Sequence, residues 1–242
     1  YAVFLRTEAQ RAGRRIPCEQ TPRYLFSVRE ILRAYPEARV INMIRDPRDV
    51  LVSQRSKWKR RFLGGSSIPM REAIRAWCNY HPWLVSRLWL SCVEYAVSIE
   101  EARFLSIRFE DLLGHPEKEV QRLCDFIGIE FDSEMLNAPQ IGSSTGRDSP
   151  DEKGLDKDRV GGWRKTGIPA GARLTCEWVC HDRMSALGYG GFLNRGRFSP
   201  RVLFATLSLP GKLALAFGFN VTRFPHLFES LKRRLALSRK PV

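Results

Sequence analysis

The stretch 38–57 constrains the fold of this 242-residue chain more than any other. Within it, Val40–Ile44 is a short, mostly apolar run, which is typical of a buried strand in a parallel sheet. A helix start follows almost at once. Asp46 suits the N-cap, a proline occupies the first helical position, and Asp49 is spaced roughly as in a capping box. The chain is therefore predicted to leave a strand, turn immediately and enter a helix.

Three residues around this strand and helix suggest an anion site. Arg45 directly follows the strand, and ligands of open α/β sheets bind at the carboxyl ends of the strands. Ser53 and Lys57 lie further along the helix, four residues apart. A guanidinium, a hydroxyl and an ammonium group near a helix start form a suitable phosphate site. The alternative interpretation is a capped helix that carries only surface charges.

The rest of the body is predicted to be mixed α and β. Phe104–Phe109 is the second clear strand, and a helix over Pro116–Ile127 should stop at the glycine behind it. Met70–Val97 is a long helical region that Pro82 should divide or kink. Pro139–Lys157 is polar and has no core pattern, so it is predicted to be a loop.

Four segments, in this order, resemble sulfotransferases, which use 3′-phosphoadenosine 5′-phosphosulfate (PAPS). Glu-Gln-Thr-Pro at 19–22 is similar to their Glu-Lys-Thr-Pro element, and Arg-Asp-Pro-Arg-Asp-Val at 45–50 to their 3′-phosphate-binding segment. Residues 108–129 resemble a segment usually written with tyrosine at the position of Phe109. Arg159–Lys165 resembles the basic segment, containing glycine and tryptophan, that folds over the adenosine. The order is much more specific than any one segment.

The resemblance implies a fold and a nucleotide site. The fold would be α/β, a P-loop-NTPase-like three-layer parallel sheet with flanking helices, formed by residues 1–194. PAPS would be the sulfonate donor and 3′-phosphoadenosine 5′-phosphate (PAP) the product, without a metal. Glycines allow close backbone approach, an indole offers a stacking face, and cations neutralise phosphate. The implied nucleotide-binding residues are Arg45, Ser53, Lys57, Phe109, Arg159, Gly161, Trp163, Arg164 and Lys165.

Two departures from the family pattern concern catalysis. No Gly-rich loop for the 5′-phosphosulfate occurs between Tyr1 and Glu19. We therefore expect the chain to be an N-terminally truncated piece that lacks the first strand and the donor loop. Gln20 stands where the family has a lysine, so an amide replaces a charge that assists the leaving group. Glu19 is the acid left here to act as base, although it could equally cap a turn. Glu19 and Gln20 are the candidate catalytic residues.

Three functions were weighed. The leading hypothesis is transfer of a sulfonate from PAPS to a hydroxyl or amine acceptor, which could be a carbohydrate, a protein or a small molecule. A kinase-like phosphoryl transferase is disfavoured because Gly-x-x-x-x-Gly-Lys-Ser/Thr is absent from the sequence. The non-enzymatic alternative is a degenerate sulfotransferase-like binding module that docks through its basic tail.

Residues 195–242 carry most of the excess charge. They hold ten Lys or Arg against one acid, Glu229, which leaves +5 of the net +14 for the rest of the chain. They are predicted to form a separate basic amphipathic helical tail. The apolar run 202–221 is interrupted at 210–212, and each piece is shorter than the roughly 20 residues a membrane span requires. Packing on the body or on a partner is favoured over contact with an anionic membrane surface, and nucleic acid is least favoured.

The six cysteines help to predict the cellular compartment of the protein. No C-x-x-C pair occurs, and no second cluster completes a metal site with Cys176, Cys180 and His181. Five of the six lie in apolar helical patterns, where free cysteine behaves as a small buried hydrophobe. Reduced cysteines favour the cytoplasm, with association to a membrane as the alternative.

Overall fold

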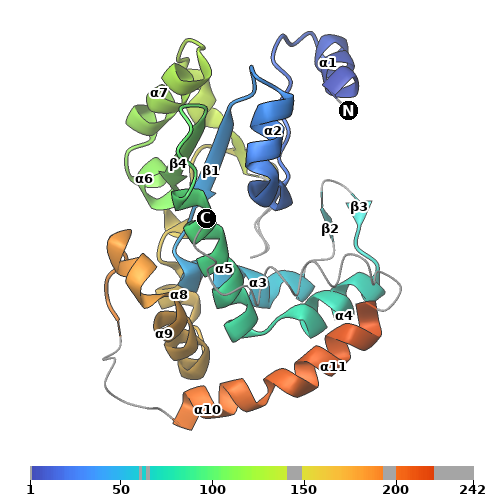
Figure 1. Cartoon of the computed structure of the whole chain (residues 1–242), viewed down its shortest axis with the longest axis vertical. Helices are drawn as coiled ribbons and strands as arrows, with labels where there is room; N and C mark the ends of the chain where they lie inside the picture. Colours follow the sequence, from blue (N-terminus) through green and yellow to red (C-terminus); the bar gives the residue numbers. More distant parts are fainter. Residues whose placement is uncertain (1, 60–61, 64–65, 141–148, 193–199, 221–242) are drawn as a thin grey trace. The chain divides into compact units, whose positions relative to one another are not determined.

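A computed structural model of the chain describes residues 2–59, 62–63, 66–140, 149–192 and 200–220 (Figure 1). The chain divides into two compact units, residues 1–38 and 39–242.

The first unit is helical. It contains α1 (Ala2–Arg11), the 3-10 helix η1 (Pro22–Ser27) and α2 (Val28–Ala34). Ser27, with φ −120° and ψ 16°, is not helical, so it separates η1 from α2. Val28 and Leu32 are the buried apolar residues of α2.

The second unit contains the parallel pair that the sequence predicts. Strand β1 (Val40–Ile44) pairs in parallel with β4 (Phe104–Arg108), and Ile44 lies opposite Arg108. The side chain of Asn42 donates a hydrogen bond of 3.1 Å to the hydroxyl of Ser106 across the pair. Parallel strands joined through helices confirm the α/β class.

One expectation about β1 was wrong, because the strand is buried on one face only. Ile41 and Met43 are 39% and 48% exposed, whereas Ile44 is 7% exposed. Successive side chains of a strand point to opposite faces, and the main core contacts only the face that carries Ile44.

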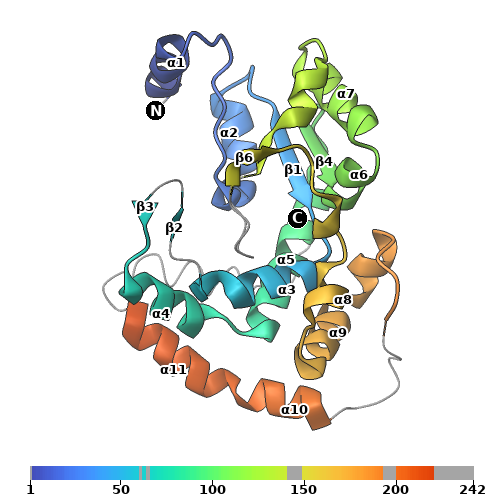
Figure 2. The same cartoon turned by 180° about the vertical axis from the view of Figure 1, so that it is seen from behind.

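Helices α3 (Pro47–Ser56), α5 (Pro82–Val97) and α9 (Ala170–Ala186) enclose this core. Figures 1 and 2 show the three helices side by side below the parallel pair. Leu51 is fully buried, and Gly188, two residues after the end of α9, has a φ of 75°, which suits a residue without a side chain. The core residues are Ile44, Leu51, Val85, Trp89, Val93, Cys176, Cys180, Met184 and Tyr189.

The predicted helix boundaries are largely confirmed. The region 70–97 divides into α4 (Met70–Asn79) and α5, and Pro82 occupies the first turn of α5. After α6 (Phe109–Gly114), α7 (Pro116–Ile127) ends at Gly128 in the left-handed conformation, with φ 81°.

The loop predicted for 139–157 is partly wrong. Strands β5 (Pro139–Gln140) and β6 (Ser149–Lys153) pair antiparallel, and residues 141–148 between them lie outside the described residues. This pairing connects backbone groups and requires no apolar alternation, so the polar sequence gave no sign of it. The other short elements are η2 (Lys57–Lys59), β2 (Phe62–Leu63) paired with β3 (Ser66–Ser67), η3 (Ser133–Asn137), η4 (Lys157–Arg159) and α8 (Gly162–Thr166).

The described part of the tail packs on the body. Helix α10 (Pro200–Leu207) contacts α9, and α11 (Leu209–Asn220) runs along α4. The ammonium group of Lys212 donates to the carbonyl of Trp77 at 3.2 Å, and the amide of Asn220 donates to Asn79 at 2.9 Å. No helix within the described ranges is long and apolar enough to cross a membrane. Residues 221–242 lie outside those ranges, and the predicted boundary at residue 194 stays a prediction.

The six cysteines are free thiols. Cys78, Cys124, Cys176 and Cys180 are buried, Cys92 is half-buried and Cys18 is exposed. The Cys180 thiol donates to the carbonyl of Ser86 at 3.3 Å, and burial raises its pKa.

Tyr80, which follows α4, provides a stability prediction. In the described part of the chain its buried hydroxyl has no hydrogen-bond partner, and burial raises the pKa to about 12. Tyr80→Phe should therefore raise the free energy of unfolding by about 1 kcal/mol at neutral pH, because an unpaired polar group leaves the interior. A raised phenol pKa means that the folded state holds the proton more tightly. The wild type should thus lose stability as pH rises above 10, and Tyr80→Phe should lose less.

Urea unfolding at several pH values would measure both effects. Tyr189→Phe is the matched control, because the hydroxyl of Tyr189 donates to Glu110 Oε2 at 2.9 Å. That variant should lose about 1 kcal/mol. Equal destabilisation of Tyr80→Phe and Tyr189→Phe would contradict the finding that the buried Tyr80 hydroxyl lacks a hydrogen-bond partner among the described residues.

Candidate functional site

Arg45 lies at the carboxyl end of β1, as the sequence predicts. Its Nη2 donates to the carbonyl of Arg159 at 2.6 Å, and its Cζ lies 4.7 Å from the centre of the Phe109 ring. Its own carbonyl accepts a 2.9 Å bond from the indole N–H of Trp89, which fixes the backbone here. The side chain is 30% exposed, and its Nε has no hydrogen-bond partner among the described residues. The guanidinium is therefore held in place yet keeps capacity to bind an anion.

Phe109 begins α6, directly after β4, and its ring supports Arg45. A tyrosine hydroxyl is absent at this position, but an aromatic face remains. The neighbouring Glu110 links two elements: its Oε1 accepts from the backbone N–H of Asp46 at 2.8 Å, and its Oε2 accepts from Tyr189. Burial, followed by the charge of Glu110, raises the pKa of Tyr189, so its hydroxyl stays a donor.

Asp49 performs a different task from the one predicted. Asp46 caps α3 by accepting from the N–H of Arg48 at 2.9 Å, but the Asp49 carboxylate does not complete a capping box. It accepts instead from the N–H groups of Gly161 at 2.9 Å and Trp163 at 2.7 Å. These N–H groups belong to the start of α8, so Asp49 caps that helix from outside it. The buried carboxylate also lies 3.9 Å from Nη2 of Arg45.

Arg48 is the centre of a buried cluster at the N-terminus of α3. Its side chain is 1% exposed, and it donates to both carboxylate oxygens of Asp46, with Nη2 2.7 Å from Oδ2. Nη1 donates to the carbonyl of Gly190 at 2.9 Å and to Glu177 on α9 at 3.4 Å. Although burial lowers it, the pKa of Arg48 is raised by its bonds and attraction to Asp46 and Glu177. We call these residues, with Arg173 and Trp163, the Arg48 cluster.

Trp163 does not offer the stacking face that the sequence suggested. It is 5% exposed, and three guanidinium carbons lie near its ring: those of Arg48 at 4.3 Å, Arg164 at 4.4 Å and Arg173 at 4.7 Å. Burial of this large aromatic ring among three cations stabilises the fold, through apolar burial and cation–π attraction, more than an exposed ring would. A nucleotide base would not find this ring accessible in the present arrangement.

The other members of segment 159–165 differ in their surroundings. Arg159 contributes its carbonyl to Arg45, while its Nε donates to Asp156 at 3.4 Å. Gly161, with φ 66°, caps α8, where a side chain would approach Arg164 to 3.0 Å. Lys165 is exposed and bonded to Asp158 at 2.5 Å. The structure therefore joins Arg159 to Arg45 through its carbonyl, and Gly161 to Asp49 through its backbone N–H.

Ser53 and Lys57 follow Arg45 along α3. Ser53 is half-buried, and Lys57 is exposed where α3 passes into η2. Lys57 keeps helical dihedral angles, φ −56° and ψ −34°, so the spacing of four residues brings both onto one side of the helix.

The candidate catalytic residues belong to the first unit. Glu19 and Gln20 are both exposed, and Glu19 accepts a 2.7 Å hydrogen bond from the hydroxyl of Thr21. That contact matches the turn-capping role left open for Glu19, and the roles of both residues in catalysis stay predictions.

The sequence did not predict the roles of Arg48 and Glu110, and it gave Asp49 a different one. Each is charged and close to the candidate anion site, yet each is directed toward the protein rather than toward a ligand. The one sequence signal was that all three lie within a few residues of the ends of the two predicted strands. No group of three or more His, Cys, Asp or Glu side chains in the described ranges is arranged to hold a metal ion.

Comparison with known proteins defines the class. The profile of the sulfotransferase family matches residues 2–133, which is more than half of the chain. The chain therefore belongs to the sulfotransferase family.

Individual relatives are more distant. Sulfotransferase 2A1 of Homo sapiens is 26% identical over 144 residues, which cover 57% of this chain and 45% of that protein. Protein-tyrosine sulfotransferase A of Caenorhabditis elegans is 27% identical over 131 residues, which cover 53% of this chain and 32% of that protein. The chain thus spans less than half of the length of either relative.

Two solved structures are similar at lower identity. A sulfotransferase domain from the curacin biosynthetic pathway is 22% identical, covers 78% of this chain and 68% of its own, and has a TM-score of 0.47. A sulfotransferase domain of the Synechococcus PCC 7002 olefin synthase is 24% identical. The match covers 79% of this chain and 64% of that domain, with a TM-score of 0.48.

Proposed function

We propose that this chain carries the 3′-phosphate side of a PAPS site, and that the protein transfers a sulfonate from PAPS to a hydroxyl or amine. Membership of the family supports sulfonate transfer in general. The observation that carries the proposal is Arg45. Its guanidinium lies at a strand end, is fixed by the Arg159 carbonyl and the Phe109 ring, and remains 30% exposed, while its Nε is buried without a hydrogen-bond partner among the described residues.

The phosphate contacts are proposed for three residues in particular. Arg45 would provide a charge-assisted, directional contact, Ser53 a hydroxyl donor and Lys57 a second cation. Arg159 and Arg164 are weaker candidates for contact with the phosphate, because the Arg159 side chain already contacts Asp156 and the Arg164 side chain contacts Trp163. Phe109 would support the arginine, and any base contact from this ring would be to its edge or its other face. We propose no direct phosphate contact for Trp163, Gly161 and Lys165. They would contribute by holding segment 159–165 in its conformation.

The reaction would be an in-line displacement. The acceptor oxygen or nitrogen forms a bond to sulfur, the bond from sulfur to the bridging oxygen breaks, and PAP leaves with that electron pair. The acceptor proton passes to a base, for which we propose Glu19. Gln20 would donate hydrogen bonds to the developing charge but cannot neutralise it. Positioning and fixed donors supply most of the acceleration in comparable group transfers.

Calorimetric titration with PAP tests the nucleotide site. The wild type should bind saturably, and Arg45→Ala should weaken binding about tenfold to a hundredfold, because a charged donor to phosphate is lost. Arg122→Ala on α7 is the matched control, since its side chain is 49% exposed and pairs with Glu119 on the same helix. That variant should bind like the wild type. Equal affinity of Arg45→Ala and wild type would overturn the placement of the phosphate at Arg45.

A binding module without catalysis is the second candidate. It is favoured by one observation, the neutral Gln20 at the position where the family carries a lysine. Mixing the protein with PAPS and a panel of hydroxyl and amine acceptors separates the two. Tight PAP binding without any consumption of PAPS would favour the module, and transfer to an acceptor would establish the enzyme.

A further inference from the structure

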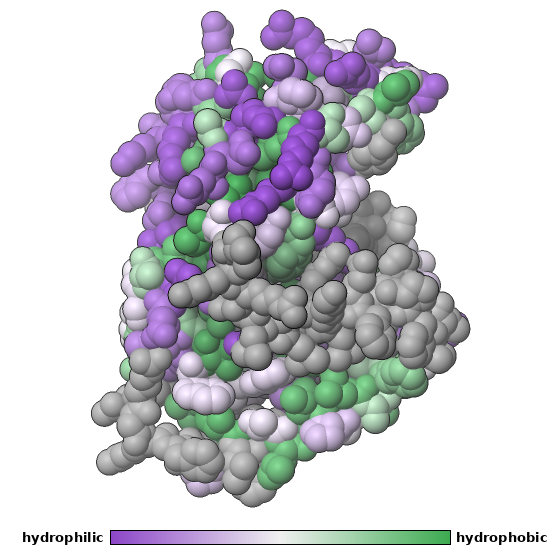
Figure 3. Space-filling model, in the orientation of Figure 1, coloured by the Kyte–Doolittle hydropathy of each residue, from purple (hydrophilic) through white to green (hydrophobic). Residues whose placement is uncertain are grey.

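The outer surface of α11 is apolar without interruption. Its exposed residues are Pro210, Gly211, Ala214, Leu215, Phe217, Gly218 and Phe219, none of which carries a polar side chain. Leu215 and Phe217 are 44% and 49% exposed, and Leu207, at the end of α10, is 63% exposed. In Figure 3 apolar residues gather along the lower edge of the molecule, where α11 runs. We call these α11 residues, with Leu207, the α11 face.

Other residues of α11 pack on the body. Ala216 and Asn220 are buried, and Asn220 and Lys212 contact α4. A helix on the surface of a soluble domain normally turns its polar residues outward. Here the inward side already contains the two polar anchors and the outward side is apolar, which is the reverse of the usual pattern. Among the described residues, the α11 face is thus an apolar surface open to solvent.

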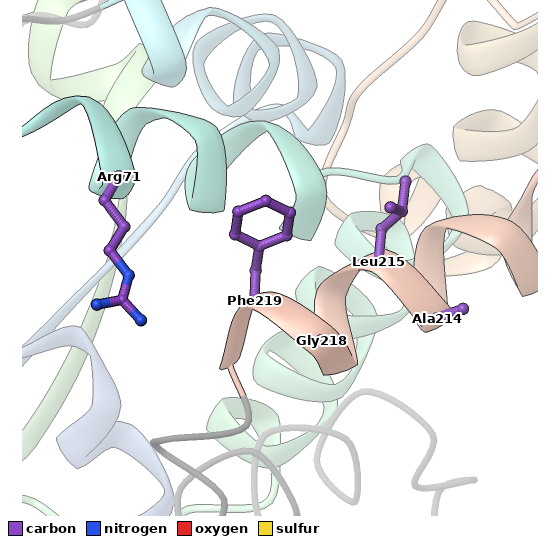
Figure 4. A pocket seen from close by; sticks show the side chains of 5 residues that line it. All are labelled: Arg71, Ala214, Leu215, Gly218 and Phe219. Carbon is purple, nitrogen blue, oxygen red and sulfur yellow. The ribbon is translucent and has the colours of Figure 1, made fainter.

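The α11 face continues into a shallow depression shared with α4. Arg71, Leu215, Gly218 and Phe219 line it together with Ala214, and it has a volume of about 470 Å³. Figure 4 shows Leu215 and Phe219 side by side along α11, with Arg71 of α4 next to Phe219. A cation thus stands beside the apolar surface. Trp77, 47% exposed on α4, adds an aromatic ring 3.2 Å from the ammonium of Lys212.

The charges around the α11 face favour one partner. Helices α10 and α11 contain no Asp or Glu. The sequence that follows, 221–242, has six Lys or Arg against Glu229 alone, interleaved with phenylalanine and leucine. Apolar and aromatic residues next to cations, without acids, suit the boundary between anionic headgroups and acyl chains. A helix of twelve residues can lie in that boundary but is too short to cross it.

We propose that the α11 face docks on an anionic lipid surface, so that Leu207, Leu215 and Phe217 enter the acyl boundary while Arg71 lies at the headgroups. The proposal goes beyond sulfonate transfer and does not depend on it. It assigns α11 two different sides, one toward the body and one toward the bilayer.

Sedimentation with vesicles tests the proposal. The full chain should bind vesicles of phosphatidylcholine mixed with phosphatidylserine, bind pure phosphatidylcholine vesicles much less, and lose binding as salt rises. The double variant Leu215→Ser, Phe217→Ser should bind the mixed vesicles at least about tenfold more weakly, because two apolar side chains no longer enter the lipid. Trp178→Ser on α9 is the matched control, since that indole is 64% exposed and lies outside the α11 face.

Two outcomes would overturn the proposal. One is absence of binding by a wild-type chain whose circular dichroism shows it folded, or binding that the double variant retains in full. The other is a concentration-dependent dimer in analytical ultracentrifugation that the double variant abolishes, which would assign the face to a second copy. The double variant should melt at the same temperature as the wild type, which would show that any loss of vesicle binding is not caused by unfolding.

Discussion

Replacing Arg48 with methionine should lower the free energy of unfolding by about 3–5 kcal/mol, although the substitution keeps much of the side-chain volume. Arg48 is 1% exposed and is the partner of Asp46 and Glu177, which are buried with it. Methionine would leave the Asp46 carboxylate without the Arg48 guanidinium and would remove one of the two arginines of the Arg48 cluster that pair with Glu177, Arg173 being the other. The ring of Trp163 would also lose one of the three cations around it.

Urea unfolding followed by tryptophan fluorescence measures this loss. Arg11→Met is the control and should stay within about 0.5 kcal/mol of the wild type, because Arg11 is 73% exposed on α1 and pairs with the exposed Glu8. Arg48→Lys should recover only part of the loss, because an ammonium group cannot reproduce the paired contact with both oxygens of Asp46. A loss below about 1 kcal/mol for Arg48→Met would show that the Arg48 cluster does not hold α3 to α9.

Asp49→Ala should release segment 159–165 and lower the free energy of unfolding by about 2–4 kcal/mol. The carboxylate accepts from two N–H groups of the α8 start and lies near Arg45, so its removal leaves three groups with fewer partners. Amide hydrogen exchange at Gly161 and Trp163 should quicken more than the global destabilisation explains. Affinity for PAP should fall as well, since Arg45 loses the ordered Arg159 carbonyl.

Asp125→Ala is the control, because that carboxylate is exposed on α7 and accepts from Gln121 of the same helix. It should change neither the exchange at Gly161 and Trp163 nor PAP binding. Unchanged exchange at these two amides in Asp49→Ala would refute the capping role of Asp49.

The Asp49 carboxyl also makes a prediction about pH. Burial raises its pKa, which the bonds from Trp163 and Gly161 and the charge of Arg45 only partly offset. The folded state therefore holds this proton more tightly than the unfolded state, and the stability that this group contributes falls as pH rises through the raised pKa. The advantage of the wild type over Asp49→Asn should narrow as pH rises above the ordinary aspartate pKa of about 4, which urea unfolding at a series of pH values would show.

The sequence predicted the site at the level of segments. A strand that ends just before Arg45 and a helix capped by Asp46 are confirmed, because local apolar pattern and capping chemistry determine them. The second strand, predicted over Phe104–Phe109, is confirmed except for its last residue, since Phe109 begins α6. The proximity of Phe109 to Arg45 follows from the parallel register of the two strands. Membership of the sulfotransferase family is confirmed by the match over residues 2–133.

The sequence could not tell which charged residue faces the protein and which faces a ligand. Arg45 and Arg48 are both arginines of one motif, yet one is 30% and the other 1% exposed, because only Arg48 meets the carboxylates of Asp46 and Glu177. Glu177 lies 129 residues further along the chain than Arg48, and no local sequence pattern predicts the contact between the two. The burial of Trp163 likewise depends on distant partners, because Arg48 and Arg173 lie against its ring.

The sequence by itself determined the elements of this protein. Period, capping residues and glycine stops set the strands and most helix ends, since these depend on neighbours within a few residues. Tertiary structure alone decided that Asp49 caps α8, that Trp163 lies inside the Arg48 cluster, and that α11 turns its apolar side outward. Those outcomes depend on contacts between distant segments, where burial determines whether a charge is a structural partner or remains available to bind.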